Sequence, residues 1–151
     1  MENTLVIIKP DGLKKRIYKD VLERFLKNGL SISHINMQYL DKEIIREHYA
    51  HLVDRPFYPM LEEFMLSGPV VIMIVSGIDA INKVRLLIGN TDPKKAHPGT
   101  IRGDYGDKEC MTYNVIHASD SHESAIIEIE RFYNIIMDDS KNRRVYEKNK
   151  N

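Results

Sequence analysis

The segment Val70–Val75 reads Val-Val-Ile-Met-Ile-Val and is the longest apolar run of the chain. It follows Ser67-Gly68-Pro69, a group of residues typical of turns. A short, uninterrupted run rich in β-branched residues predicts a central strand that is covered on both of its faces. The run is far too short to cross a bilayer as a helix, which takes roughly 20 apolar residues. We therefore expect the chain to fold around this strand.

Three other segments predict strands of the same sheet. Thr4 to Ile8 is a β-branched run that stops at Pro10, and Met111 to Ile116 is a second short run. Between them, Ser31 to Leu40 alternates in polarity, which predicts a strand with one wet face. The alternation sets Ile35, Met37 and Tyr39 against His34, Asn36 and Gln38.

Helices are predicted between these strands. Apolar residues recur every four positions from Leu13 to Phe25, and Gly29 follows at a C-cap position, so this segment predicts one amphipathic helix. Capping residues and periodicity predict four more helices. They begin at Asp41, near Pro59, at Asp79 with Gly89 as the stop, and at Asp120-Ser121-His122-Glu123, which has capping-box spacing.

The order β-α-β-α-α-β-α-loop-β-α includes an aperiodic loop from Asn90 to about Cys110. A loop of that length in a compact domain is usually functional or disordered. The order predicts an α/β fold of the ferredoxin-like α+β sandwich kind, with a four-stranded antiparallel sheet and helices covering one face. We expect one domain over residues 1–151, with an irregular C-terminal tail over about residues 139–151.

Composition limits the classes of function. Hydrophobic residues make up 42% and charged residues 29%, which is typical of a globular protein. The 22 basic and 22 acidic residues cancel, so we expect no broad cationic face and no stable nucleic-acid partner. Cys110 is the only cysteine, and Met1-Glu2-Asn3 runs straight into the first apolar stretch. These features predict a cytoplasmic protein without an internal disulfide or a membrane segment.

The segment Asn114 to Ser121 reads Asn-Val-Ile-His-Ala-Ser-Asp-Ser and places His117 between a strand and a helix start. A phosphate is stabilised near the N-terminus of a helix, and a neutral imidazole can attack phosphorus and hold the group covalently. One ring nitrogen must then be held by a partner, for which Ser119 and Glu128 are candidates. The alternative is that His117 is a capping or surface residue, the commoner role of a lone histidine.

A cationic window extends from the helix that stops at Gly89 into the long loop. From Arg85 to Gly103 there are four Lys or Arg residues and one Asp. The guanidinium groups of Arg85 and Arg102 suit phosphate oxygens, and Thr91 adds a hydroxyl donor. The alternative makes both arginines ordinary surface charges. Lys9 ends an apolar strand, where a charge is costly unless it meets an anion or a polar ligand.

Other sequence patterns support a metal site, a P-loop or a hydrolase less well than a phosphotransferase. His48-x-x-His51 has helical spacing for a metal pair, but no cysteine or third histidine joins it in an obvious pattern, so we predict no protein metal ligands. The sequence has neither a Gly-x-x-x-x-Gly-Lys loop nor a Gly-x-Ser-x-Gly elbow. A regulatory nucleotide binder without turnover and a Ser-His-Asp hydrolase remain as alternatives to a phosphotransferase.

Six separated blocks, in order, are similar to the nucleoside diphosphate kinase family. A coincidence of six ordered blocks is implausible, whereas one motif would carry little weight. The blocks are Val6 to Gly12, His48-Tyr49 with Arg55-Pro56-Phe57, Ser67 to Val70, Arg85 with Gly89 to Pro93, Pro98 to Asp104, and Asn114 to Asp120.

The resemblance implies an activity. It implies transfer of the γ-phosphate of a nucleoside triphosphate to a nucleoside diphosphate by a ping-pong mechanism, through a pros-phosphohistidine at His117, with little base specificity. The partners implied are ATP, GTP, ADP, GDP and their deoxy forms, with Mg²⁺ bridging the phosphates and no protein side chain as metal ligand. The family also implies a homo-oligomer, either a hexamer or a tetramer.

The resemblance also assigns roles to individual residues. Ser119 and Glu128 orient His117, and Lys9 and Asn114 bond the sugar hydroxyls. Phe57 stacks on one face of the base and Met111 on the other, where the family often carries valine; for both, the alternative is a core residue. The phosphate ligands implied are Arg85, Thr91 and Arg102, with Tyr49 on the terminal phosphate.

The chain departs from the family pattern at a few places. The interval from Arg102 to Asn114 is longer than in the family, beside the expected base site. Ala118 replaces the common glycine after the histidine, and Phe132 stands near the place of the usual tryptophan.

Overall fold

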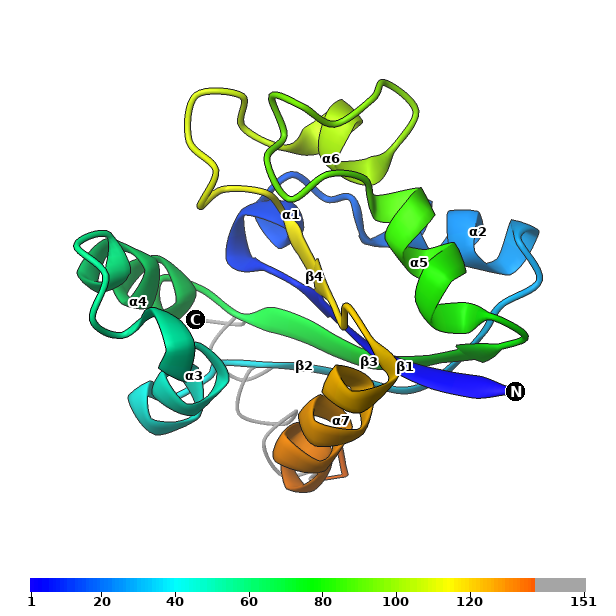
Figure 1. Cartoon of the computed structure of the whole chain (residues 1–151), viewed down its shortest axis with the longest axis horizontal. Coiled ribbons are helices and arrows are strands. Elements are labelled where there is room, and N and C mark those ends of the chain that lie inside the picture. The colour runs from blue at the N-terminus through cyan, green and yellow to red at the C-terminus, as the bar shows by residue number, and fades with distance from the viewer. Residues whose placement is uncertain (138–151) are drawn as a thin grey trace, which may run out of the picture.

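The computed structural model describes residues 1–137, so the predicted irregular tail over residues 139–151 lies outside the described residues. The described part contains a sheet and its covering helices (Figure 1). In chain order the elements are β1 (Glu2–Ile8), α1 (Pro10–Lys14), α2 (Tyr18–Lys27), β2 (Ser31–Gln38), α3 (Lys42–His48), η1 (Ala50–Leu52), α4 (Tyr58–Leu66), β3 (Val70–Gly77), α5 (Ala80–Ile88), α6 (Ile101–Tyr105), β4 (Ile116–Ala118) and α7 (His122–Ile136).

The sheet has four strands in the order β2-β3-β1-β4, and every neighbouring pair is antiparallel. The predicted four-stranded antiparallel sheet is therefore confirmed. The run that predicted a central strand lies in β3, between β2 and β1, and its residues from Val70 to Met73 are buried. β4 adds to the other edge of β1, with His117 opposite Ile7.

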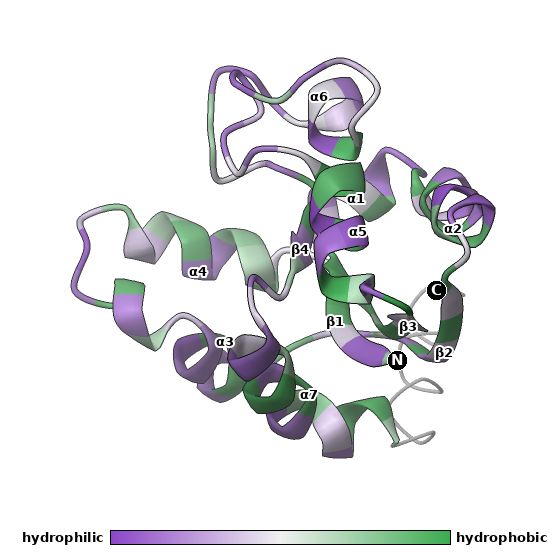
Figure 2. Cartoon of the chain, turned by 45° about the vertical axis from the view of Figure 1, so that its right-hand side comes forward, coloured by the Kyte–Doolittle hydropathy of each residue, from purple (hydrophilic) through white to green (hydrophobic). Residues whose placement is uncertain are grey.

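Helices cover both faces of this sheet, so the expectation of helices on one face was wrong. In β1, Val6 and Ile8 pack into a core cluster with residues of α2 and α5, whereas Leu5 and Ile7 pack into a second cluster with residues of α3, α4 and α7. Figure 1 shows these two helix layers on opposite sides of the strands, and Figure 2 shows hydrophobic residues alternating with hydrophilic ones along α4 and α5. A continuously apolar strand exposes apolar side chains on both faces, so each face needs a cover.

The helix predicted from Leu13 to Phe25 is broken into α1 and α2. Arg16 has a φ of 60°, and the Ile17 amide donates to the carbonyl of Gly12, five residues earlier. This is the hydrogen bond of a Schellman turn, in which the left-handed position is usually glycine. Because arginine takes that place here, the sequence carried no signal for the break.

β2 has one exposed face, as predicted, but two of the three polar residues expected there, Asn36 and Gln38, point inward. Asn36 and Gln38 are buried, and their amides donate to carbonyls at the end of α7: Gln38 to Ile135 at 3.2 Å, and Asn36 to Ile135 at 3.0 Å and also to Ile136. Ile35 instead is exposed. The register shifts between Ser33 and Asn36, which reverses the phase of the alternation, and the last carbonyls of a helix need such donors.

The last strand begins later than predicted. Residues 111–115 are irregular, and Val115 has a φ of 63°, so β4 contains only Ile116–Ala118. Val115 is fixed from both sides, since its amide donates to the Asp11 carboxylate at 3.1 Å and its carbonyl accepts from the Lys9 amide at 2.9 Å. These bonds to the start of α1 shorten the strand and put His117 in its middle.

The predicted loop from Asn90 to about Cys110 contains one short helix, α6, which Thr100 caps by accepting from the Gly103 amide. Asp41 caps α3 as predicted, with Ile44 donating to its carboxylate at 3.0 Å. The helix predicted at Asp120 begins one residue later, with Ser121 as the N-cap. Among residues 1–137, no helix is both long and apolar enough to cross a membrane.

Candidate active site

A cavity of about 750 Å³ opens between the α3–α4 arm, the loop that carries α6, and the start of α7. These segments are far apart in the chain and meet around the ends of β1 and β4 (Figure 1). The cavity brings together all the predicted site residues except Ser119. The predicted residues that line it are Lys9, Tyr49, Phe57, Arg85, Thr91, Arg102, Met111, Asn114, His117 and Glu128.

The imidazole of His117 is held through one ring nitrogen. Its Nε2 lies 2.7 Å from Oε1 of Glu128, and the hydroxyl of Ser119 donates to the same oxygen at 2.8 Å. An ionised carboxylate only accepts hydrogen bonds, so we assign the ring proton to Nε2. Nδ1 then carries the free lone pair, which is what a nucleophilic imidazole requires.

The surroundings keep this imidazole neutral and its carboxylate partner ionised. Burial lowers the pKa of His117, and the charges of Lys9 and Arg102 lower it further, against the opposing effect of Glu128. Burial alone raises the pKa of Glu128, but hydrogen bonds from His117 and Ser119 and nearby cations leave it below its usual value. At neutral pH the pair is therefore a neutral ring donating to a carboxylate.

Ser119 lies behind the site rather than in it. It is fully buried, and its hydroxyl donates to Glu128. A hydroxyl in that position orients the carboxylate but does not reach a substrate, which argues against the Ser-His-Asp hydrolase.

Lys9 and Asn114, the two residues that the resemblance assigned to the sugar hydroxyls, bond each other and form one unit. Nζ of Lys9 donates to Oδ1 of Asn114 at 2.8 Å, and the Asn114 amide donates to the carbonyl of Thr91 at 2.9 Å. Burial and the nearby Arg102 lower the pKa of Lys9 to about 8. Both side chains are thereby fixed before any ligand binds.

The two arginines are anchored to main-chain carbonyls next to His117. Arg102 is buried and donates to the carbonyl of Ile116 at 2.6 Å, and Arg85 donates to that of Ala118 at 3.4 Å. Burial and the charge of Arg85 lower the pKa of Arg102 to about 10. Its Nε is buried and has no hydrogen-bond partner within residues 1–137. A buried cation with an unsatisfied donor is suited to an anionic ligand.

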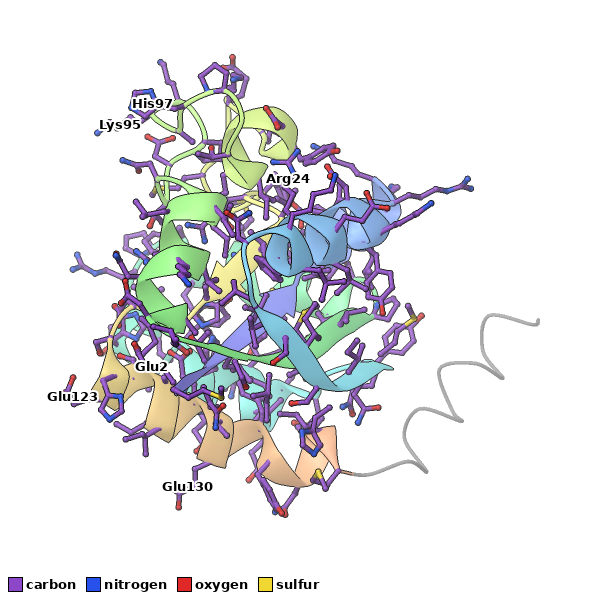
Figure 3. The ribbon with its side chains drawn as sticks, turned by 90° about the vertical axis from the view of Figure 1, so that its right-hand side faces the viewer. Glu2, Arg24, Lys95, His97, Glu123 and Glu130 are labelled. Atoms are coloured by element: carbon purple, nitrogen blue, oxygen red, sulfur yellow. The ribbon has the colours of Figure 1, made fainter. Side chains whose placement is uncertain are left out.

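The remaining cations of the predicted loop do not join this cluster. Lys94 and Lys95 are exposed and do not line the cavity, and Figure 3 shows Lys95 and His97 extending outward from the loop. Arg85 and Arg102 are therefore the two members of that cationic window that reach the site.

Aromatic residues bound the cavity on the α3 side. Tyr49 is buried. Its burial, and to a smaller extent the charge of Glu128, raises the pKa of its hydroxyl, which therefore stays protonated. At the mouth, Phe57 is 42% exposed and Met111 is 54% exposed. Neither belongs to the core, so the alternative of a core Phe and a core Met is wrong.

Among the cavity residues that the sequence did not predict, His48 and Arg131 contact each other beside His117. The ring of His48 lies edge-on to that of His117, with centroids 4.6 Å apart, and Nη1 of Arg131 lies 2.8 Å from Nδ1 of His48. Arg131 comes three residues after Glu128 in α7, so helical spacing alone places it on the same face. That spacing was the signal available in the sequence.

One group of side chains within residues 1–137 could hold a metal ion. His48, His117 and Glu128 offer ligand atoms that lie within 4.8 Å of one another. His51, the other half of the sequence pair, does not belong to this group. Because Glu128 and His117 already bond each other, an ion there would displace the bond that orients the ring.

Cations and a carboxylate-bound imidazole around one cavity, on a ferredoxin-like sheet, define a phosphotransferase that works on a polyphosphate. The comparisons with known proteins narrow that class. The family model for nucleoside diphosphate kinase matches residues 2–136. The chain belongs to the nucleoside diphosphate kinase family, whose members are nucleotide-binding transferases that pass a phosphate from a nucleoside triphosphate to a nucleoside diphosphate.

Individual relatives agree over most of their length. The nucleoside diphosphate kinase of Acetivibrio thermocellus is 47% identical over 133 residues, covering 88% of this chain and 96% of that protein. That of Pyrococcus furiosus is 46% identical, covering 88% of this chain and 83% of that protein. Among solved structures, the Halobacterium salinarum enzyme in complex with CDP has a TM-score of 0.83 and 40% identity, covering 91% of this chain and 89% of that one.

Proposed function

We propose that the nucleoside diphosphate kinase reaction proceeds on this chain through a phosphohistidine at Nδ1 of His117, by a ping-pong mechanism. The observation that carries the proposal is the pair of hydrogen bonds, 2.7 and 2.8 Å long, that join His117 and Ser119 to one oxygen of Glu128. They fix the ring and leave Nδ1 as the nitrogen with a free lone pair.

In the first half-reaction the Nδ1 lone pair attacks the γ-phosphorus of a nucleoside triphosphate. The N–P bond forms as the bond from the γ-phosphorus to the bridging oxygen breaks, and its electron pair leaves with the nucleoside diphosphate. The ring gains positive charge, which the carboxylate of Glu128 stabilises. In the second half-reaction a terminal oxygen of another diphosphate attacks the phosphorus, and the N–P electron pair returns to Nδ1.

The cations around His117 supply the electrostatic stabilisation. In phosphoryl transfer the charge spreads over the peripheral oxygens, and fixed donors stabilise it without reorganising. Arg85, Thr91 and Arg102 are the proposed phosphate ligands, with Tyr49 and Lys9 near the group in transfer. The anchored guanidinium groups and the unsatisfied Nε of Arg102 support this assignment.

Mg²⁺ is proposed on the substrate phosphates rather than on protein ligands. The side chains at the phosphate end are mainly cationic, and Glu128 is engaged by His117 and Ser119, so phosphate oxygens and water suit the ion better. When bound, Mg²⁺ would neutralise part of the phosphate charge.

The sugar and base are proposed to lie between the Lys9–Asn114 unit and the mouth. Lys9 and Asn114 would bond the sugar hydroxyls, and Phe57 and Met111 would contact the base faces. Stacking does not distinguish one base from another, which accounts for little base specificity. The CDP complex of the Halobacterium salinarum structure supports nucleoside diphosphates as ligands.

Two further proposals concern the setting of the enzyme. We propose a homo-oligomer, hexamer or tetramer, and the exposed Ile35 on the edge strand β2 supports a partner on that edge. We propose the cytoplasm as its location, which the single free Cys110 supports.

The experiment that tests the mechanism is labelling with γ-labelled triphosphate. We expect an acid-labile, alkali-stable phosphoprotein that releases its label to an added diphosphate. Absence of label, or label that persists in His117→Ala, would rule out a phosphohistidine at His117. Release to water with labelling of serine would favour the hydrolase, and binding without label would favour the regulatory nucleotide binder.

A further inference from the structure

Arg131 lines the cavity but takes no part in the transfer proposed above. It lies on α7 one turn after Glu128, and its side chain is only 16% exposed. The preceding residue, Glu130, points away from the body of the protein (Figure 3). Burying a guanidinium is costly unless its donors are used, so its contacts indicate what it does.

Those contacts are with two consecutive residues of α3. Nη1 of Arg131 lies 2.8 Å from Nδ1 of His48. Its Nε lies 3.7 Å from the Glu47 carboxylate, too far for a hydrogen bond, and has no hydrogen-bond partner within residues 1–137. A guanidinium has donors and no acceptor, so Nδ1 of His48 must be the acceptor. A neutral imidazole that accepts at Nδ1 carries its proton on Nε2. The contact therefore selects one of the two neutral tautomers of His48.

His48 transmits this constraint to the imidazole of His117. The two rings are nearly perpendicular, at 85°, with centroids 4.6 Å apart. His48 is itself enclosed, with the ring of Tyr49 at 4.7 Å and that of Phe132 at 5.2 Å. The ring of His117 thus has two fixed neighbours, the Glu128 carboxylate at Nε2 and the ring of His48.

We propose that Arg131 is a positioning residue that fixes the tautomer and the ring orientation of His48, which in turn holds the His117 imidazole in its orientation for attack. The inference rests on the proposed function of His117. It adds a residue outside the phosphate-binding set, acting on the nucleophile through another ring. A misplacement of about 1 Å can cost on the order of a hundredfold in rate, so a loosened ring has a measurable effect.

The charges around His48 give the inference a pH signature. Burial lowers the pKa of His48 well below its usual value, and His117, Arg131, Lys9 and His51 lower it further. These groups face His48 from β4, from α7, from the end of β1 and from the adjoining η1, and the Glu128 carboxylate on α7 also lies within 4.8 Å of a His48 ring nitrogen. Removing the Arg131 cation must raise the pKa of His48, so His48 takes up a proton at a higher pH. The titration of the His48 ring nitrogens then moves to higher pH.

The test compares Arg131→Leu and Arg131→Lys with a matched control, Arg46→Leu. Arg46 lies on α3 and, like Arg131, is paired with another side chain. Its partner is the Glu62 carboxylate of α4, at 2.7 Å, and Arg46 does not line the cavity. Nitrogen NMR of ¹⁵N-labelled protein without nucleotide reports the tautomer and the pKa of His48. Single-turnover labelling of His117 reports the rate and the nucleotide affinity.

We expect Arg131→Leu to mix the tautomers of His48, raise its pKa and slow phosphorylation about tenfold, with unchanged nucleotide affinity. Arg131→Lys keeps one donor, so it should restore the tautomer and most of the rate, and Arg46→Leu should match the wild type. Arg131→Met replaces the leucine variant if that protein does not fold.

Two results would overturn the inference: an unchanged His48 tautomer in Arg131→Leu, or weaker nucleotide binding with an unchanged rate, which would make Arg131 a direct phosphate ligand. If the wild type takes no label, the function at His117 fails, while the NMR arm still decides whether Arg131 sets the tautomer.

Discussion

The two ends of the cavity are built differently. At the phosphate end, Lys9, Arg102 and Asn114 are buried and hydrogen-bonded to other protein groups before any ligand arrives. At the mouth, Phe57 and Met111 are about half exposed. Preorganised donors contribute most where charge develops in the transition state, whereas an open, apolar mouth accepts any flat ring. The proposed chemistry and the proposed base tolerance therefore belong to separate parts of one cavity.

The largest effect is expected at the nucleophile. His117→Ala removes the group that would carry the phosphoryl intermediate, so transfer from triphosphate to diphosphate should be abolished in a coupled assay. His122→Ala is the matched control, because His122 is exposed at the start of α7 and does not line the cavity. Residual turnover in His117→Ala close to the wild-type rate would show that another group accepts the phosphate.

The next largest effect is expected at the anchored cation. Arg102→Ala removes a buried cation that we propose as a phosphate ligand, so kcat/KM should fall by roughly one to a few powers of ten. Thermal unfolding must be followed in parallel, since Arg102 also bonds the carbonyls of Gly89 and Ile116. A loss equal to that of His117→Ala would argue that the imidazole is not the nucleophile.

The pH dependence tests whether the buried end is preorganised. The pKa of His117 is lowered, so the neutral ring persists below pH 6.5, its usual value, and the acid limb of the labelling rate should lie below that pH. Glu128→Gln removes a charge that raises this pKa, so the acid limb should move lower still, while the rate falls roughly tenfold. An acid limb that moves to higher pH in Glu128→Gln would contradict the assigned charges.

The lowered pKa of His117 also affects how the free energy of unfolding depends on pH. The unfolded chain binds a proton at His117 more readily than the folded protein does, so stability rises with pH across that range. The contribution of His117 is present above about pH 6.5 and is lost as the pH falls below that unfolded value. His117→Gln should reduce the acid sensitivity of the midpoint of urea unfolding between about pH 6.5 and 5. An unchanged acid dependence would mean that the pKa of His117 is the same in the folded and the unfolded protein.

The smallest effect is expected at the mouth. Phe57→Ala should raise the KM for all nucleotides by roughly three- to tenfold, with little change in kcat, because stacking contributes equally before and during the reaction. Met111→Ala gives the comparison within the mouth and should change KM less, since its side chain is more exposed. A change that affects one base far more than the others would contradict a tolerant mouth.

Part of the fold and of the site could be predicted from the sequence, and each failed prediction concerns a single short segment. The central strand at Val70–Val75, the cap at Asp41 and the clustering of Lys9, Arg102, Asn114 and His117 were predicted, because apolar runs, caps and motif blocks are written locally. The break at Arg16 was not, because a left-handed arginine leaves no mark in the sequence.

The prediction that Asn36 and Gln38 face solvent failed for a different reason. Their partners are the last carbonyls of α7, almost 100 residues away in the chain. Only the packed structure reveals that a helix end accepts from those donors, and that a register shift in β2 turns them inward.

The sequence by itself determined the number of strands, the family and the residue types needed for phosphoryl transfer, but not where the last strand begins. The tertiary structure alone decided which nitrogen of His117 is held, that Ser119 stands behind the carboxylate, and that Arg131 reaches His48. The reason is physical: a pattern along the chain specifies which face of an element is buried, whereas a hydrogen bond between side chains depends on the distance at which separate elements pack.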